Sequence, residues 1–200
     1  MPAQTKRWTA QEVRDLADES RHWPRYELIG GELFVTPAPR PVHQHACALL
    51  WSALRDYVRS AGVGEVYASP ADIELEPGTI VQPDVFVTPR VGGRRPREWS
   101  EVAALTLAVE VVSPSSARAD RVVKRAFFAR MGVPEYWVVD LDARVVERWR
   151  PADERPEIAT GALAWQPADA PEPLSLDLDA YFRDVHDEQD EPDAAGGATA

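Results

Sequence analysis

Apolar and polar residues alternate in several short segments of the chain, which is the pattern of β-strands with one buried face. Two segments, 81–87 and 105–112, are almost continuously apolar, so they predict strands that are buried on both faces. The alternating segments predict further strands at 26–29 and 32–35 around Gly30 and Gly31, and at 65–69, 72–76, 135–140, 144–150 and 174–178.

Apolar residues at helical spacing predict three helices. The first opens at the capping-box pair Thr9 and Glu12 and continues to about residue 18. The others cover 42–59 and 117–131, and the last follows the strand 105–112 directly as a strand-to-helix crossover. The chain is therefore expected to adopt an α/β fold (α+β mixed sheet), with a central mixed β-sheet flanked by helices.

Composition and charge set the expected boundaries and environment. We expect one domain over 1–185 and a disordered acidic tail over 186–200, since that tail is rich in acidic residues, alanine and glycine. The single cysteine, and the lack of a secretion signal or membrane span, lead us to expect a cytoplasmic protein with no membrane partner. The net charge of −11 disfavours a general polyanion binder, although residues 115–130 carry a local basic excess.

Three charged residues stand where folding alone would place none. Asp84 and Glu110 lie in the two apolar strands, and a lone buried carboxylate is costly unless a cation compensates it. Lys124 is one of only two lysines among 22 basic residues, so its retention suggests a specific need for an ammonium group. Glu110 lies about 10 Å below the end of its strand. Lys124 lies about 12 Å along the helix that runs back antiparallel to this strand. Glu110 and Lys124 should therefore lie at the same height along the sheet.

Two such carboxylates suggest a metal site. With the backbone carbonyl of Val111 they form an oxygen-rich group that suits Mg²⁺ or Mn²⁺ better than zinc. A divalent ion there and the ammonium of Lys124 would support phosphodiester hydrolysis. The alternative is that Lys124 only pairs with Asp120 one turn earlier, as an ordinary contact on the helix surface.

At these residues the sequence resembles the Uma-family restriction endonucleases of the PD-(D/E)XK nuclease superfamily. The resemblance covers about residues 8–182 and is carried by an ordered set of motifs. These are Tyr26-Glu27-Leu28-Ile29-Gly30-Gly31-Glu32-Leu33, His43-Gln44, Gln82-Pro83-Asp84, Val109-Glu110-Val111-Val112-Ser113-Pro114-Ser115 and Gly132-Val133-Pro134-Glu135-Tyr136-Trp137-Val138-Val139-Asp140. The resemblance implies a restriction-endonuclease-like core, a divalent metal and cleavage of nucleic acid.

The resemblance also implies roles for individual residues. Asp84 matches the aspartate of the motif, Glu110 its second acid, and Glu32 the acidic residue near the first strand. The departure is Val112, which stands where the superfamily usually has lysine. Lys124 would be the migrated replacement.

Several other residues have weaker claims. His43 could contact a phosphate or a metal-bound water, although a histidine near a helix start more often caps or packs. Ser113 could contact substrate, but its position favours a capping role, since no nucleophile elbow surrounds it. We expect Glu27 to be a solvated surface residue and Cys47 a small buried filler.

Three arginines, Arg118, Arg121 and Arg125, are expected on one face of the last helix. They could follow the phosphates of a nucleic acid or simply solvate the surface, and the second interpretation is slightly favoured.

Three functions compete. The leading hypothesis is a metal-dependent DNA endonuclease, which is expected to be a homodimer because symmetric double-strand cleavage needs two sites. The second is an inactive nuclease-like domain that binds a protein partner, as Val112 and the negative charge suggest. A glycoside hydrolase with two carboxylates ranks last, because Lys124 nearby would keep both acids ionised.

Overall fold

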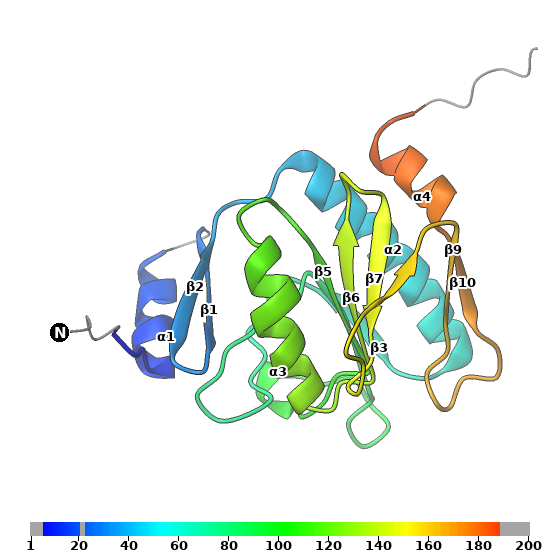
Figure 1. Cartoon of the computed structure of the whole chain (residues 1–200). Coiled ribbons are helices and arrows are strands. Elements are labelled where there is room, and N and C mark those ends of the chain that lie inside the picture. Colours follow the sequence, from blue (N-terminus) through cyan, green and yellow to red (C-terminus); the bar gives the residue numbers. More distant parts are fainter. Residues whose placement is uncertain (1–5, 21–22, 189–200) are drawn as a thin grey trace, which may run out of the picture.

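A six-stranded mixed sheet forms the centre of the computed structural model, which describes residues 6–20 and 23–188 (Figure 1). The strand order is β3-β4-β5-β6-β7-β8, and only β5 and β6 are parallel. The strands are β3 (Glu65–Ala68), β4 (Val85–Thr88), β5 (Leu107–Val111), β6 (Glu135–Asp140), β7 (Val145–Trp149) and β8 (Glu157–Ala159). The predicted mixed sheet is confirmed, and the strands expected to carry Asp84 and Glu110 are neighbours.

Two hairpins flank this sheet. The first, β1 (Arg25–Ile29) with β2 (Glu32–Thr36), turns at the predicted glycine pair, where both residues have positive φ. The second, β9 (Ala162–Trp165) with β10 (Leu174–Asp177), was predicted only for its last strand. The predicted strand 72–76 is wrong, because only the bridge Ile73↔Val81 forms there.

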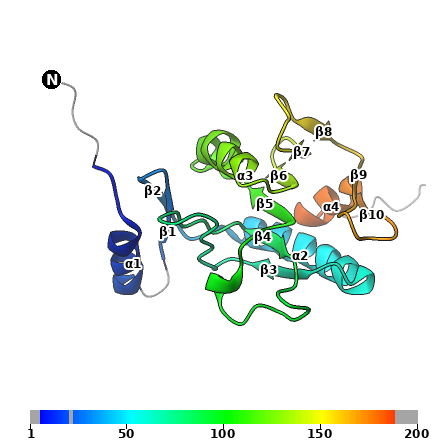
Figure 2. The same cartoon turned by 90° about the horizontal axis from the view of Figure 1, so that it is seen from below.

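The helices cover both faces of the sheet. They are α1 (Ala10–Glu19), α2 (Pro41–Ala61), α3 (Arg125–Arg130) and α4 (Leu178–Val185), with short 3₁₀ and π segments η1 (Trp99–Glu101) and η2 (Ala119–Lys124). The predicted capping box opens α1. Viewed from below, α2 and α3 lie on opposite sides of the central strands (Figure 2). The predicted helix 117–131 is present as η2 followed by α3, and the η2 part is π-helical.

The alternation along β5 decides which face carries the site. Val109 and Val111 pack with residues of α2, whereas Ala108 packs in the cluster that contains Phe127 of α3. Because side chains alternate between the two faces, Glu110 faces α3 with Ala108. One face of β5 thus places a carboxylate under the helix that carries Lys124.

The C-terminal end is ordered somewhat further than expected. Residues 186–188 were predicted to belong to the tail, yet His186 donates through Nε2 to the carbonyl of Leu141 at 3.0 Å. The remainder of the predicted tail, 189–200, lies outside the described residues. None of the helices within 6–20 and 23–188 combines the length and apolar character that crossing a bilayer requires.

Candidate active site

Lys124 lies at the centre of a buried group of carboxylates. Its Nζ is 2.8 Å from Glu27 Oε2, 3.0 Å from Glu110 Oε1 and 3.3 Å from Asp120 Oδ1. The expected meeting of Glu110 with Lys124 is confirmed, and the alternative contact with Asp120 exists at the same time. The lysine side chain is only 6% exposed, so it is not an ordinary surface residue.

The local fold explains this arrangement. Asp120 and Lys124 both belong to the π-helical segment η2, and π segments are frequent at functional sites. Tyr136 of β6 donates its hydroxyl to the carbonyl of Asp120 at 3.0 Å, which ties η2 to the sheet. The helix therefore presents both the cation and one of its acidic partners to β5.

Glu27, not Glu32, is the acid that the first hairpin contributes. Glu27 is buried, where its Oε1 accepts from the backbone amide of Gln82 at 2.8 Å and its Oε2 contacts Lys124. The expectation that Glu27 is solvated is wrong. Glu32 is exposed beside the hairpin turn and does not line the cavity described below. Glu27 lies at the middle of β1 and Glu32 beside the turn, a difference that the sequence pattern did not resolve.

Asp84 is held by a separate set of donors. Arg25 donates to its Oδ1 at 3.0 Å, while the amide of Val111 donates to its Oδ2 at 3.0 Å. His43 Nε2 lies 3.1 Å from the same Oδ2. Val111 is available because the β4–β5 pairing ends at Val85↔Val109. The aspartate thus connects α2, the first hairpin and β5.

The two carboxylates respond differently to burial. Burial alone would raise the pKa of Asp84, but His43, Arg25 and Lys124 together lower it to about 2. Burial raises the pKa of Glu110 well above its usual value, and Lys124 opposes this only in part. Lys124 remains a cation, because its carboxylate neighbours outweigh the effect of burial and raise its pKa.

Charge is unbalanced in this region. Within residues 6–20 and 23–188, the permanent cations paired with Glu27, Asp84, Glu110 and Asp120 are only Arg25 and Lys124. Burial raises the pKa of Glu110 and of Asp120, so the excess can be relieved by proton uptake at these acids or by a further cation.

A cavity of about 670 Å³ opens above these residues. Its floor includes Asp84, Glu110, Val111, Asp120 and Lys124. Its walls come from the segment 36–40, the first turn of α2, the loop after β5 and the turn after β6. The carboxylates are therefore reachable from one side.

Asp84, Glu110 and Val111 bring to one cavity oxygen atoms of the kind that hard divalent cations prefer. The carboxylates of Asp84 and Glu110 line the same cavity as Val111, and a local excess of negative charge accompanies them. Such oxygen-rich groups suit Mg²⁺ or Mn²⁺.

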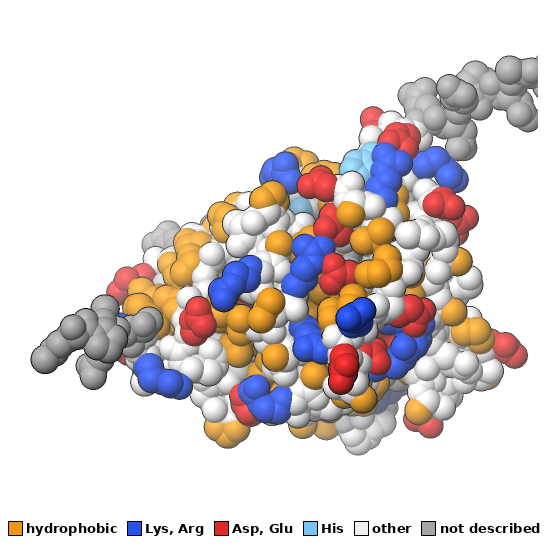
Figure 3. Space-filling model, in the orientation of Figure 1, with side chains coloured by type: hydrophobic (Ala, Val, Ile, Leu, Met, Phe, Trp, Pro, Cys, Tyr) orange, Lys and Arg blue, Asp and Glu red, His pale blue; other side chains and the backbone are white. Residues whose placement is uncertain are grey.

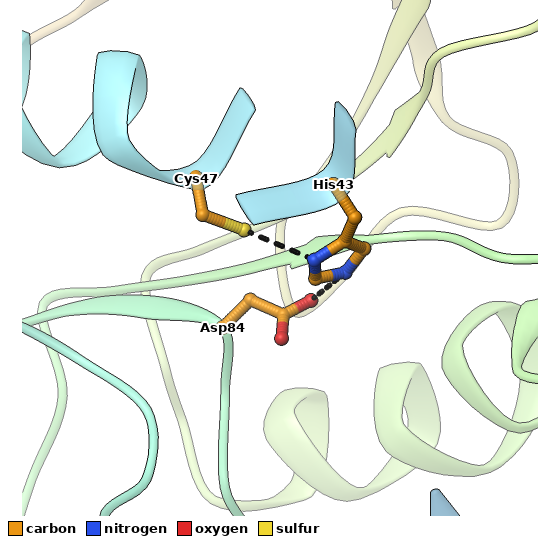
Figure 4. A group of neighbouring side chains, drawn as sticks. All are labelled: His43, Cys47 and Asp84. Carbon is orange, nitrogen blue, oxygen red and sulfur yellow. Dashed lines mark hydrogen bonds and ion pairs between the residues drawn. The ribbon is translucent and has the colours of Figure 1, made fainter. Parts of the chain in front are cut away.

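A second possible metal-binding group is His43, Cys47 and Asp84, whose donor atoms lie within 4.8 Å of one another (Figure 4). The imidazole stands between the other two, with Nδ1 3.6 Å from Cys47 Sγ and Nε2 directed to Asp84. Each of the three residues offers one donor atom, and these atoms are close enough to share one ion. Burial raises the pKa of Cys47. The hydrogen bonds within the group also fix the orientation of the His43 ring.

The remaining candidate residues fall into two groups. His43 and Ser113 line the cavity, and Ser113 exchanges hydrogen bonds with Ser116, which holds the turn before η2. Arg121 also lines the cavity but pairs with Asp140 and Glu147, both at 2.6 Å.

The other two arginines lie outside the lining. Arg125 packs over the ring of Trp149 and donates to the carbonyl of Asp153. Arg118 is exposed. The predicted common arginine face is therefore divided among separate environments.

Comparison with known proteins identifies the family. The chain matches the Uma2 family, described as "Putative restriction endonuclease", over residues 10–180. The protein belongs to this family. The similarity that the motifs indicated is confirmed. A comparison with curated sequences finds no match.

A solved structure shares the fold. It is described as "a putative nuclease belonging to DUF820" from Anabaena variabilis, and it superimposes with a TM-score of 0.67 at 20% sequence identity. The alignment covers 81% of this chain and 92% of that one. The Uma2 protein thus has the fold of that structure.

The departure of this Uma2 chain at Val112 now has a structural description. Val112 is partly buried against the cluster that contains Phe127, while Lys124 brings an ammonium to Glu110 from the helix. The sequence missed Arg25 and Glu27, although Glu27 stands in a quoted motif. Both belong to β1, whose position beside Asp84 depends on contacts across more than fifty residues.

Proposed function

We propose that the protein is a metal-dependent endonuclease that hydrolyses phosphodiester bonds of DNA. The observation that carries this proposal is the meeting of Asp84, Glu110 and Lys124 at the floor of one cavity with an excess of negative charge. Membership in a restriction endonuclease family supports the same reaction class.

Asp84, Glu110 and the carbonyl of Val111 would hold Mg²⁺ or Mn²⁺. When bound, the ion would activate a water molecule and neutralise charge on the phosphodiester. Arg25 and the Val111 amide keep Asp84 ionised and fix its orientation. Lys124 keeps a positive charge beside Glu110, where it can stabilise charge that develops on the phosphate.

The remaining residues have supporting roles in this proposal. His43 orients Asp84 from α2, and its own ring is oriented by Cys47. Glu27 and Asp120 hold the ammonium of Lys124 in place. Symmetric cutting of both strands would need two copies of the site, so a homodimer stays a prediction for sedimentation analysis. The cytoplasmic location also stays a prediction.

The test is cleavage of DNA by the purified chain with Mn²⁺, Mg²⁺ or EDTA. We expect cleavage with either ion, none in EDTA, and a loss of at least about a hundredfold in Asp84→Ala, Glu110→Ala and Lys124→Ala. Asp56→Ala is the matched control, because Asp56 is an exposed carboxylate on α2. Cleavage that survives in the three site variants would refute the proposal.

The alternative is a nuclease-like domain that binds a protein partner without catalysis, as the net charge of −11 suggests. Titration calorimetry with Mn²⁺ separates the two. Binding that disappears in Asp84→Ala supports the metal site. An absence of any binding supports the alternative.

A further inference from the structure

Two side chains that can bind a metal stand four residues apart on α2. His43 and Cys47 share one face of the helix, because residues at this spacing are neighbours on a helix surface. Both side chains point towards Asp84, which directly precedes β4 (Figure 4). Two histidines at the same spacing hold one ion in helical zinc motifs. The helix therefore brings two donors to a third that the sheet holds in place.

The donor atoms lie close to the spacing that a tetrahedral ion requires. Bond lengths to zinc of about 2.0–2.3 Å place two ligands of a tetrahedral site about 3.3–3.8 Å apart. Here His43 Nε2 is 3.1 Å from Asp84 Oδ2, and His43 Nδ1 is 3.6 Å from Cys47 Sγ. One donor atom from each residue lies within 4.8 Å of the other two. Rotation of the imidazole and of the thiol would bring one ring nitrogen, the sulfur and a carboxylate oxygen onto one ion.

The ligand types differ from those of the proposed nuclease site. Sulfur and imidazole suit zinc, whereas carboxylate and carbonyl oxygens suit Mg²⁺ and Mn²⁺. His43 and Asp84 line the cavity, so an ion can reach them from there. Zinc sites with three protein ligands take a water molecule as the fourth ligand. The group therefore has the composition of a zinc site with one open position.

Binding of zinc would change the protonation of Cys47. The S–H bond breaks, a bond forms from sulfur to zinc, and the proton passes to solvent. The raised pKa of the buried thiol opposes this step, while the double charge of the ion favours it. The proton release makes the affinity for zinc increase with pH.

We propose that His43, Cys47 and Asp84 form a binding site for Zn²⁺, and that zinc bound there weakens the binding of Mg²⁺ or Mn²⁺ at the nuclease site. Asp84 belongs to both sites. Zinc on this carboxylate reduces the negative charge that it offers to the second ion, and the two dications repel each other. Cys47 is a ligand of zinc alone, and with Mn²⁺ bound it only orients His43. The zinc site does not depend on the proposed nuclease function, whereas inhibition of cleavage by zinc rests on that function.

The first test is the absorption spectrum of the full chain with Co²⁺, a spectroscopic substitute for Zn²⁺. A sulfur ligand gives cobalt an intense charge-transfer band in the near ultraviolet, which oxygen and nitrogen ligands do not give. We expect this band to grow as Co²⁺ is added, to disappear when Zn²⁺ is added, and to be absent in Cys47→Ser. If the unsubstituted protein shows no such band, the zinc site is overturned.

Calorimetry with Zn²⁺ measures the contribution of Cys47. We expect Cys47→Ser, which keeps the size of the side chain, to weaken the binding of Zn²⁺ at least about tenfold. His45→Ala is the matched control and should leave the affinity unchanged, because His45 is exposed on the same helix and pairs with Asp184. Equal affinities of the Cys47→Ser and unsubstituted proteins would overturn the site.

Weak binding of zinc to surface carboxylates is the background of these titrations. On the face in Figure 3, acidic side chains are interspersed with basic ones, which reduces the attraction of single carboxylates for a cation. This background is the same in Cys47→Ser. The difference between the two proteins therefore reports the site alone.

The third test measures the effect of zinc on Mn²⁺, with electron paramagnetic resonance to detect free Mn²⁺. Zinc can also displace Mn²⁺ directly from the oxygen ligands, and that displacement persists in Cys47→Ser. We therefore expect the Zn²⁺ concentration that halves Mn²⁺ binding to be at least about tenfold higher in Cys47→Ser than in the unsubstituted protein. Equal concentrations in the two proteins would overturn the competition.

The same comparison applies to cleavage of DNA with Mn²⁺, where each protein is measured relative to its own rate without zinc. We expect inhibition to require at least about tenfold more Zn²⁺ in Cys47→Ser. If neither protein cuts DNA, the proposed nuclease function fails, while the cobalt spectrum and the Mn²⁺ titration still decide the zinc site.

Discussion

The two sides of the cavity floor treat their carboxylates in opposite ways. Around Asp84, Arg25, His43 and the Val111 amide supply three donors to one acid, and its pKa falls to about 2. Around Glu110, three acids share a single ammonium, and burial raises the pKa of Glu110. Asp84 is thus prepared as an anion by the fold itself, whereas Glu110 needs a further cation.

This difference indicates how the site divides its tasks. The carboxylate of Asp84 has its hydrogen-bond donors without a metal, so it is already held in position as a metal ligand. The Glu110 side gathers three acids around one ammonium, so a divalent ion bound there would favour the ionised form of Glu110. Substitutions on the two sides should therefore have different consequences for stability and for metal binding.

The largest effect is expected from Lys124→Met. It removes the cation that three buried carboxylates share, so we expect a loss of about 3 kcal/mol in the free energy of unfolding. Urea unfolding in EDTA measures it. Lys6→Met is the matched control, since the other lysine pairs with Glu12 at the surface and should cost less than about 0.5 kcal/mol. Similar losses in both variants would show that the Glu110 side is not a buried charge cluster.

Asp84→Asn and Glu110→Gln test the comparison directly. In metal-free protein, Asp84→Asn leaves Arg25 buried without its counter-charge and should cost about 2 kcal/mol or more. Glu110→Gln removes excess negative charge, so the free energy of unfolding should change by less than about 1 kcal/mol or rise. Both variants should lose Mn²⁺ binding in calorimetry. A larger loss of stability in Glu110→Gln than in Asp84→Asn would show that the metal-free fold stabilises the anion of Glu110 and not that of Asp84.

The pH dependence of metal-free stability should show the two sides separately. Because the pKa of Glu110 is raised above 4.5, its contribution to stability is full below that pH and is lost as the pH rises through the raised value. The pKa of Asp84 is lowered from 3.8 to about 2, so its contribution is present above 3.8 and is lost as the pH falls towards 2. In urea unfolding between pH 2 and 8, Glu110→Gln should remove the first dependence and Asp84→Asn the second.

A smaller effect is expected from the first hairpin. Glu27→Gln weakens contacts to Lys124 and to the Gln82 amide, so we expect a loss of about 1–2 kcal/mol and reduced cleavage. Glu32→Gln, at an exposed position of the same hairpin, should leave stability within about 0.5 kcal/mol and cleavage unchanged. If Glu32→Gln reduced cleavage and Glu27→Gln did not, Glu32 and not Glu27 would be the functional acid of this hairpin.

The smallest effect is expected from Cys47→Ala. If Cys47 only orients His43, stability should fall by about 1 kcal/mol and Mn²⁺ affinity should change less than about threefold. Loss of the calorimetric Mn²⁺ signal would instead place Cys47 among the metal ligands.

Features set by neighbouring residues could be predicted. The glycine pair of the first hairpin, the capping box of α1 and the level position of Glu110 and Lys124 all follow from local turn chemistry and from the rise per residue of strands and helices. The strands β8 and β9, of three and four residues, were not predicted. The π-helical start of the last helix has no signal in its apolar spacing.

The sequence by itself determined the central pair of this site, because Glu110 and Lys124 lie on one continuous strand-to-helix crossover whose dimensions are fixed. Only the tertiary structure decided what surrounds Asp84 and Lys124. Arg25 reaches Asp84 across 59 residues, His43 reaches it across 41, and Glu27 enters where Glu32 was expected. Such contacts depend on how separate elements pack, and packing over these distances is a collective result that no local spacing encodes.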